Sequence, residues 1–177
     1  KENFKMEVNK NLIYDVGMHK GEDTEYYLKR GFNVVAFEAN PELIVICKKK
    51  FSKEIGAGSL VIVEGAIVDE SKVYYKTVKF YKNEIKSVWG TVVQEWSDRN
   101  EYLGAKSYIV EVPIINFTQC LKEFGIPYYL KIDIEGMDIV CLESLKGFKN
   151  KPTYISIESE KVSFKNLIGE LNILETL

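Results

Sequence analysis

Five runs of apolar residues rich in Val, Ile and Tyr recur along the chain, and each is nearly continuous rather than alternating with polar residues. Short continuous runs of this kind are typical of β-strands that are covered on both faces. The pattern therefore predicts five buried strands, at residues 11–16, 33–39, 60–67, 128–134 and 153–159.

Helical patterns separate these runs. The helix predicted at 22–30 stops at Gly31, and the helix predicted at 42–51 follows Asn40 and Pro41, which suit its N-cap and its first position. Two further helices, each followed by a glycine, are predicted at 118–124 and 137–145. Because strands and helices alternate, we expect right-handed crossovers and an α/β fold with a doubly wound, mostly parallel sheet flanked by helices.

The middle of the chain departs from this rhythm. Residues 73–81 alternate between apolar and polar in the manner of an antiparallel strand, and residues 107–115 form a second candidate strand. We expect a hairpin-like insertion at about 70–115, within a single domain that spans the whole chain. The stretch between the two strands is longer than an ordinary connection and carries Trp89 and Trp96, so both a substrate lid and a surface excursion fit it.

Composition narrows the class of protein. The 177 residues are 46% hydrophobic and 28% charged, and the formal net charge is -2. This size and mixture suit one globular domain, and the charge gives no general attraction to nucleic acids or anionic membranes. No apolar run approaches the roughly 18 residues of a membrane span. We therefore expect a cytoplasmic protein without a nucleic-acid or membrane partner, and its oligomeric state is open.

The cysteines and the acidic residues bear on redox and metal chemistry. Cys47, Cys120 and Cys141 are widely spaced, odd in number and part of helical patterns, so we expect free, buried thiols in a reducing compartment. No set of His, Asp and Glu has a convincing metal-ligand spacing, and we predict no metal site. A divalent ion at Asp133 and Glu135 is the alternative left open.

The candidate chemistry begins in the turn after the first strand, which is the usual ligand cradle of a doubly wound sheet. Gly17 would let the backbone approach a ligand, and Gly21 would let the start of the helix pack against the strand. The G-x-x-x-G spacing differs from the dinucleotide fingerprint and from the phosphate-binding loop. Asp15, two residues before Gly17, indicates instead a ligand with a cation or a donor, such as a sulfonium amino acid.

Two further groups of charged residues follow at strand ends. Glu38 ends the second predicted strand, where an acid can accept both hydroxyls of a ribose. Lys131, Asp133 and Glu135 alternate around the tip of the fourth strand, so regular strand geometry would put them on one face. Charges on an apolar strand are costly unless they are paired or used, which allows either a functional cluster or a structural Lys-acid network.

Together these motifs resemble the FkbM-type methyltransferases, S-adenosylmethionine-dependent enzymes with the class I, Rossmann-like fold. The similarity runs in the expected order from "YDVGMHKGEDT" through "VVAFEANP" and "EGAIVD" to "LKIDIEGMDIVCLESLKG". Its most specific part is the signature K-x-D-x-E-G at 131–136. The resemblance implies that S-adenosylmethionine is the cofactor and that the methyl acceptor is a hydroxyl of a small molecule, a natural product or a sugar.

The resemblance also implies roles for individual residues. Glu38 would hold the ribose, and Asp133 would lie beside the transferred methyl group with Glu135 as the other candidate base. His19, the only histidine, is expected to contact the cofactor rather than to act as the base. The expected catalytic set is Asp133, Glu135 and Lys131. The expected cofactor-binding set is Asp15, Gly17, His19, Gly21, Thr24, Glu38, Ala39, Glu64, Ala66 and Asp133.

Two features depart from that family's usual pattern. Family members usually have Ala-Asn where this sequence has Met18-His19. They also finish with an antiparallel pair of strands, whereas residues 161–177 here have the pattern of an amphipathic helix. We therefore expect a trimmed or short C-terminus with an incomplete strand pair, whose last strands are absent or contributed by another chain. A non-catalytic or regulatory domain that keeps the cofactor pocket is the alternative function, and the glycine spacing argues against a nucleotide-dependent oxidoreductase.

Overall fold

The main sheet of this protein is parallel and lies at the centre of the molecule. The computed structural model describes residues 4–83, 90–94, 97–98, 102, 107–134 and 136–157. Within these residues the main sheet has the strand order β3-β2-β1-β7-β8. Its strands are β1 (Val8–Val16), β2 (Asn33–Glu38), β3 (Leu60–Glu64), β7 (Ile126–Ile132) and β8 (Tyr154–Ile157).

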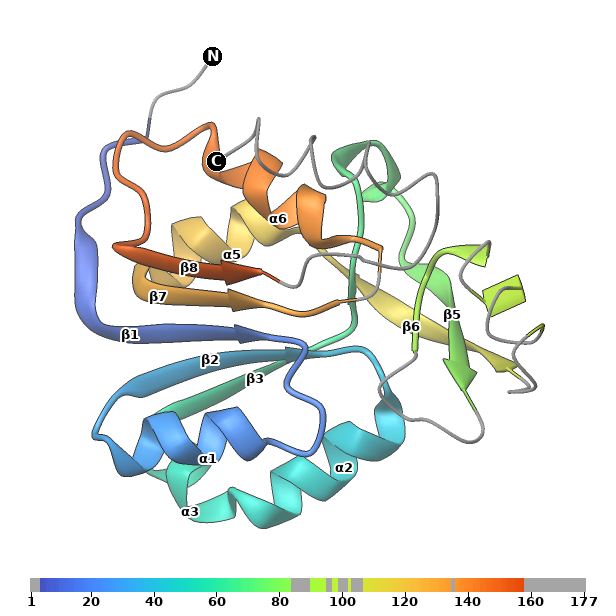
Figure 1. Ribbon diagram of the computed structural model, residues 1–177, viewed down its shortest axis with the longest axis horizontal. Coiled ribbons are helices and arrows are strands. Elements are labelled where there is room, and N and C mark those ends of the chain that lie inside the picture. The colour runs from blue at the N-terminus through green and yellow to red at the C-terminus, as the bar shows by residue number, and fades with distance from the viewer. Residues whose placement is uncertain are drawn as a thin grey trace.

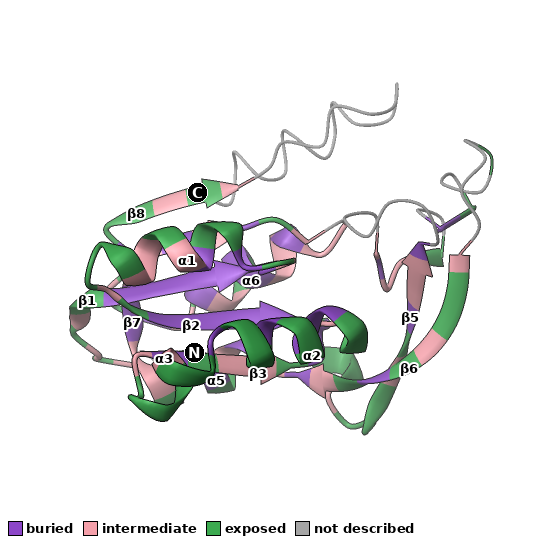
Figure 2. Cartoon of the chain, turned by 90° about the horizontal axis from the view of Figure 1, so that it is seen from below, coloured by how far each residue is buried: buried purple, intermediate pink, exposed green. Residues whose placement is uncertain are grey.

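Helices cover both faces of this sheet (Figure 1). On one side lie α1 (Glu22–Lys29), α2 (Pro41–Lys50) and α3 (Ser52–Gly56), and on the other lie α5 (Phe117–Phe124) and α6 (Asp138–Leu145). The second half of β1, from Leu12 to Val16, and all of β2 after Asn33 are buried between them (Figure 2). The strand order and the helices on both faces confirm the predicted doubly wound, Rossmann-like α/β fold.

Two apolar clusters hold the layers together. Cys47 and Phe51 pack with Val34 of β2 on the side of α2, and Tyr14 packs with Phe117 on the side of α5. The three cysteines are free and buried, one in each of α2, α5 and α6, as predicted. Local signals set the helix limits as expected: the Asn40 side chain accepts the N–H of Glu42 at 3.0 Å, with Pro41 at the first position of α2.

A smaller sheet carries the insertion and has the order β4-β6-β5. The antiparallel pairing of β5 (Thr77–Asn83) with β6 (Ser107–Ile115) confirms the predicted hairpin-like pair, although β5 begins four residues later than expected. A one-turn helix, η1 (Glu70–Lys72), precedes β5.

The prediction of one continuous strand at 60–67 is wrong. Gly65 has φ +136° and interrupts it, so β4 (Ala66–Ile67) leaves the main sheet and pairs with β6. A Cβ on Gly65 would lie 2.4 Å from the Pro113 carbonyl oxygen, which explains the glycine at this crossing.

The fourth predicted strand is shifted. It begins at Ile126 and ends at Ile132, so Asp133 lies beyond the strand and does not continue the alternation that begins at Lys131. Several predictions fall outside the described residues: Glu135, both tryptophans, the end of the fifth strand and the C-terminal helix. None of the helices in the described ranges has the length and apolar character that crossing a bilayer requires.

Candidate functional site

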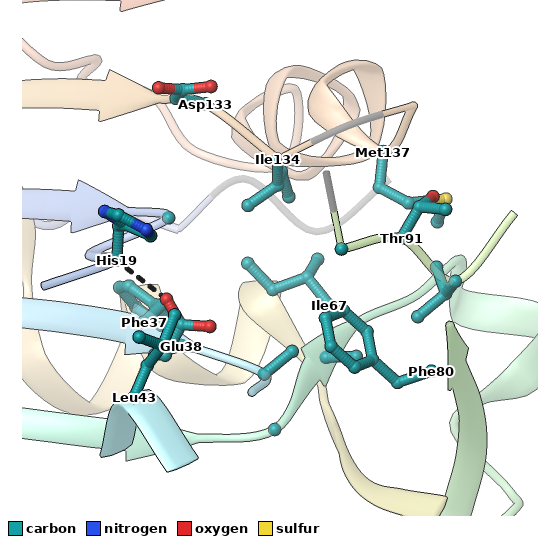
Figure 3. A pocket seen from close by; sticks show the side chains of 16 residues that line it. His19, Phe37, Glu38, Leu43, Ile67, Phe80, Thr91, Asp133, Ile134 and Met137 are labelled. Atoms are coloured by element: carbon teal, nitrogen blue, oxygen red, sulfur yellow. Dashed lines mark hydrogen bonds between the residues drawn. The ribbon is translucent and has the colours of Figure 1, made fainter. Parts of the chain in front are cut away.

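A pocket opens at the carboxyl ends of β1, β2 and β7, the edge where ligands bind in doubly wound sheets (Figure 3). The β1–α1 turn and the end of β2 form one part of its wall, and the segment after β7 forms another. The insertion sheet closes the third side with residues of β5 and of 90–92. The described lining residues are Gly17, His19, Phe37, Glu38, Ala39, Leu43, Gly65, Ala66, Ile67, Phe80, Gly90, Thr91, Val92, Asp133, Ile134 and Met137.

The β1–α1 turn is held against both neighbouring strands. The N–H groups of Gly17 and Met18 donate to the Phe37 carbonyl at 3.1 and 3.0 Å, and the Asp133 N–H donates to the Val16 carbonyl at 2.9 Å. Gly17 has φ +90°, and a Cβ there would lie 2.0 Å from the carbonyl oxygen of Asp133. Only glycine therefore fits between the turn and the segment after β7.

Gly21, the second glycine of the turn, serves packing and does not line the pocket. Its φ is +75°, and a Cβ would lie 2.4 Å from the ring of Phe51. At Gly21 the start of α1 therefore packs against the aromatic ring that follows α2, and Thr24 in its first turn contacts β1 through Asp15.

Glu38 is the most constrained acid of the pocket. Its Oε2 accepts the backbone N–H of His19 and its Oε1 accepts the backbone N–H of Asn40, each at 2.8 Å, and the residue is 9% exposed. Burial raises the pKa of this carboxyl above its ordinary value, and the backbone hydrogen bonds from Asn40, His19 and Ala39 oppose that rise. An ionised carboxylate has about four acceptor positions, so Glu38 can still accept a donor from a ligand.

Glu64 is the register partner of Glu38 on β3 but lies outside the pocket lining. Its side chain is 44% exposed and forms an ion pair with Lys48. Its neighbour Ala66 does line the pocket, as does Ala39 after β2. Of the two acids at these strand ends, Glu38 alone contributes to the pocket described.

Asp15 and Lys131 form a buried ion pair beneath the turn. Asp15 is fully buried: its Oδ1 lies 3.1 Å from Lys131 Nζ, and its Oδ2 accepts the Thr24 hydroxyl at 2.6 Å. Lys131 also lies 3.1 Å from Asp23 Oδ2 and donates to the Gly17 carbonyl at 3.4 Å. Burial alone would lower the pKa of Lys131, but Asp15 and Asp23 raise it above its ordinary value and keep the ammonium charged.

Asp133 differs from Asp15 because its side chain is exposed and lies at the pocket wall (Figure 3). Asp138 fixes the segment that carries Asp133, because its Oδ1 accepts the N–H of Ile134 at 3.2 Å. Thus Gly17, His19, Glu38, Ala39, Ala66 and Asp133 meet at one pocket. Asp15, Gly21, Thr24, Glu64 and Lys131 do not line it.

Sequence reasoning missed the apolar side of the pocket. Phe80 and Thr91 come from the insertion and lie at the end away from Asp133 in Figure 3, with Met137 of the segment after β7. Val92 of the insertion also lines the pocket. The alternation at 73–81 predicted a strand but gave no sign of which face would meet the main sheet. Within the described residues no group of three or more His, Cys, Asp or Glu could hold a metal ion.

Comparisons with known proteins identify the family of this chain. A crystal structure of precorrin-6y C5,15-methyltransferase from Geobacter metallireducens GS-15 aligns with a TM-score of 0.48 and 13% sequence identity. The alignment covers 96% of this chain and 62% of that one, so this chain spans less than two thirds of that enzyme. A search of curated protein sequences finds no match. The model of the methyltransferase FkbM domain matches residues 15–174. The chain belongs to the FkbM methyltransferase family.

Proposed function

We propose that this protein is an S-adenosylmethionine-dependent O-methyltransferase that acts on a hydroxyl of a small molecule, a natural product or a sugar. The observation that carries the proposal is Glu38, whose two oxygens are each fixed by one backbone N–H at the end of β2. An acid in this position suits the two hydroxyls of a ribose.

The other described lining residues fit the rest of such a cofactor. Ala39, Ala66 and Ile67 offer small and apolar surface beside Glu38 for a nucleobase. Glu38 and Asp133 are the acids of the described lining, and no lysine or arginine is among them. A wall with carboxylates and without cations favours a sulfonium over the phosphates of a dinucleotide.

The reaction requires a base at the acceptor. When bound, S-adenosylmethionine supplies a methyl group on a positively charged sulfur, open to attack by an oxygen. We assign Asp133 the role of general base, because its exposed carboxylate lies at the pocket wall beside the glycine turn. It would take the proton of the acceptor hydroxyl, while the turn and the Ile134 segment hold the reactants in place.

Isothermal titration tests the cofactor. We expect S-adenosylhomocysteine to bind and NAD⁺ not to bind, and we expect Glu38→Ala to weaken binding by about 100-fold or more through loss of two hydrogen bonds to a charged group. Glu64→Ala is the matched control, since it removes the same residue from the register partner on β3 and should leave affinity unchanged. Equal losses in both variants, or tighter binding of NAD⁺, would refute the cofactor proposal.

A methyl-transfer assay with labelled S-adenosylmethionine and a panel of hydroxyl compounds tests the chemistry. Asp133→Asn should retain S-adenosylhomocysteine affinity and lose about 100-fold or more in rate, as expected for removal of a general base. Full activity of this variant would refute the assignment of Asp133. Cofactor binding without transfer to any hydroxyl would support the non-catalytic alternative.

A further inference from the structure

His19, in the β1–α1 turn, has a left-handed backbone conformation that is unfavourable for a residue with a side chain. Among the described residues, it is the only non-glycine residue with positive φ, at +54°. The left-handed conformation costs roughly 1–2 kcal/mol for an ordinary residue, and His, Asn and Asp tolerate it better than most. Such strain persists only where the surroundings fix it, which raises the question of what fixes it here.

Both backbone groups of His19 are engaged. Its N–H donates to Glu38 Oε2 at 2.8 Å (Figure 3), and its carbonyl accepts the Sγ–H of Cys47 at 3.3 Å. One contact comes from the end of β2 and the other from α2, so two elements clamp the residue. Its imidazole lies at the pocket wall, with Nδ1 3.6 Å from Glu22 Oε2.

We propose that His19 is a positioning residue, which acts on the cofactor site through the left-handed backbone that aims its N–H at Glu38. The inference rests on the proposed function insofar as Glu38 holds the ribose. Asn40 fixes one oxygen of Glu38 and His19 fixes the other. The two donors set the plane of the carboxylate, so its remaining lone pairs face the ligand. Without the His19 donor, Oε2 would lose this anchor and the carboxylate would be freer to rotate.

Three variants separate the backbone from the imidazole. His19→Asn and His19→Gly remove the ring but accept positive φ, whereas His19→Val removes the ring and resists it, because a β-branched residue is strongly disfavoured there. We expect S-adenosylhomocysteine to bind the Asn and Gly variants about 10-fold more tightly than the Val variant. Equal losses in all three would assign the contact to the imidazole and overturn the proposal, as would unchanged affinity in the Val variant.

A ligand-free measurement distinguishes failure of this inference from failure of the proposed function. The carboxyl ¹³C signal of Glu38, followed by NMR against pH, should titrate at higher pH in His19→Val, because the ionised form loses a donor, and should not move in His19→Asn. If the unmodified protein binds no S-adenosylhomocysteine, the proposed function fails and this titration still decides the role of His19. Should His19→Val not fold, His19→Ala replaces it, with the same direction expected.

Discussion

The buried pair of Asp15 and Lys131 allows a stability prediction that can be worked out from the geometry. In Lys131→Met the aliphatic stem is largely kept, but Asp15 loses its counter-ion while fully buried. At an effective dielectric constant of about 20, two unit charges 3.1 Å apart attract by about 5 kcal/mol. Desolvation offsets part of this attraction, and breaking a buried pair from one side typically costs about 3–5 kcal/mol.

We therefore expect Lys131→Met to lower the free energy of unfolding by about 3–5 kcal/mol, measured by urea denaturation near neutral pH. Asp23 is 54% exposed and adds little. The control is Lys146→Met, which breaks an exposed pair with Glu143, about half exposed on both sides, and should cost less than about 1 kcal/mol. The penalty in Lys131→Met should shrink toward acidic pH, because Asp15 then escapes by taking a proton.

The double variant Asp15→Asn with Lys131→Met is the decisive measurement. It removes both charges and leaves an amide oxygen that can accept the Thr24 hydroxyl, so it should be more stable than Lys131→Met alone. If the double variant is no more stable than the single one, or if Lys131→Met costs no more than Lys146→Met, the reasoning about a buried ion pair is wrong.

Three further predictions concern neighbouring positions. Gly17→Ala should abolish cofactor binding in titration calorimetry and lower the melting temperature, because its Cβ would overlap the Asp133 carbonyl at 2.0 Å; normal binding would contradict this. The affinity for S-adenosylhomocysteine should fall as the pH drops through the pKa of Glu38, which lies above its ordinary value, since only the ionised form accepts two hydroxyls. Glu38→Gln should flatten that pH dependence, and a flat profile in the unmodified protein would refute the prediction. Tyr14→Phe should cost about 1–3 kcal/mol in urea denaturation, because the buried hydroxyl donates to the carbonyls of Cys120 and Gly125 at 3.1 and 3.0 Å; a neutral result would contradict that role.

The sequence predicts elements well where local signals exist. Asn40 with Pro41 and the glycines after helices mark ends that the structure reproduces within one or two residues. It fails at Gly65, because an apolar run keeps the same pattern whether it stays in one sheet or crosses to another. A break of this kind depends on the contact with Pro113, nearly fifty residues later, which no local pattern contains.

Within the candidate site, residue type predicts chemistry better than it predicts direction. Glu38 and Glu64 both end strands and both looked suited to a cofactor, yet burial and the two N–H donors distinguish Glu38, whereas Glu64 pairs with Lys48. Asp15 and Lys131 were each selected from a separate motif, but neither motif shows that the two side chains contact each other across neighbouring strands. The apolar side of the pocket, which comes from the insertion, could not be predicted, because tertiary packing sets the position of the insertion against the main sheet.

The pairing of Asp15 with Lys131 also bears on the order in which the chain is made. The two residues are 116 positions apart in the sequence. At a translation rate of roughly 5–20 residues per second, Lys131 is synthesised on the order of ten seconds after Asp15. Until then β1, β2 and β3 can meet, but they would bury an uncompensated carboxylate. A ribosome-bound chain halted before β7 should therefore remain open to proteases, and protection should begin only once Lys131 has emerged. One charge pair thus makes the early half of the sheet depend on the late half.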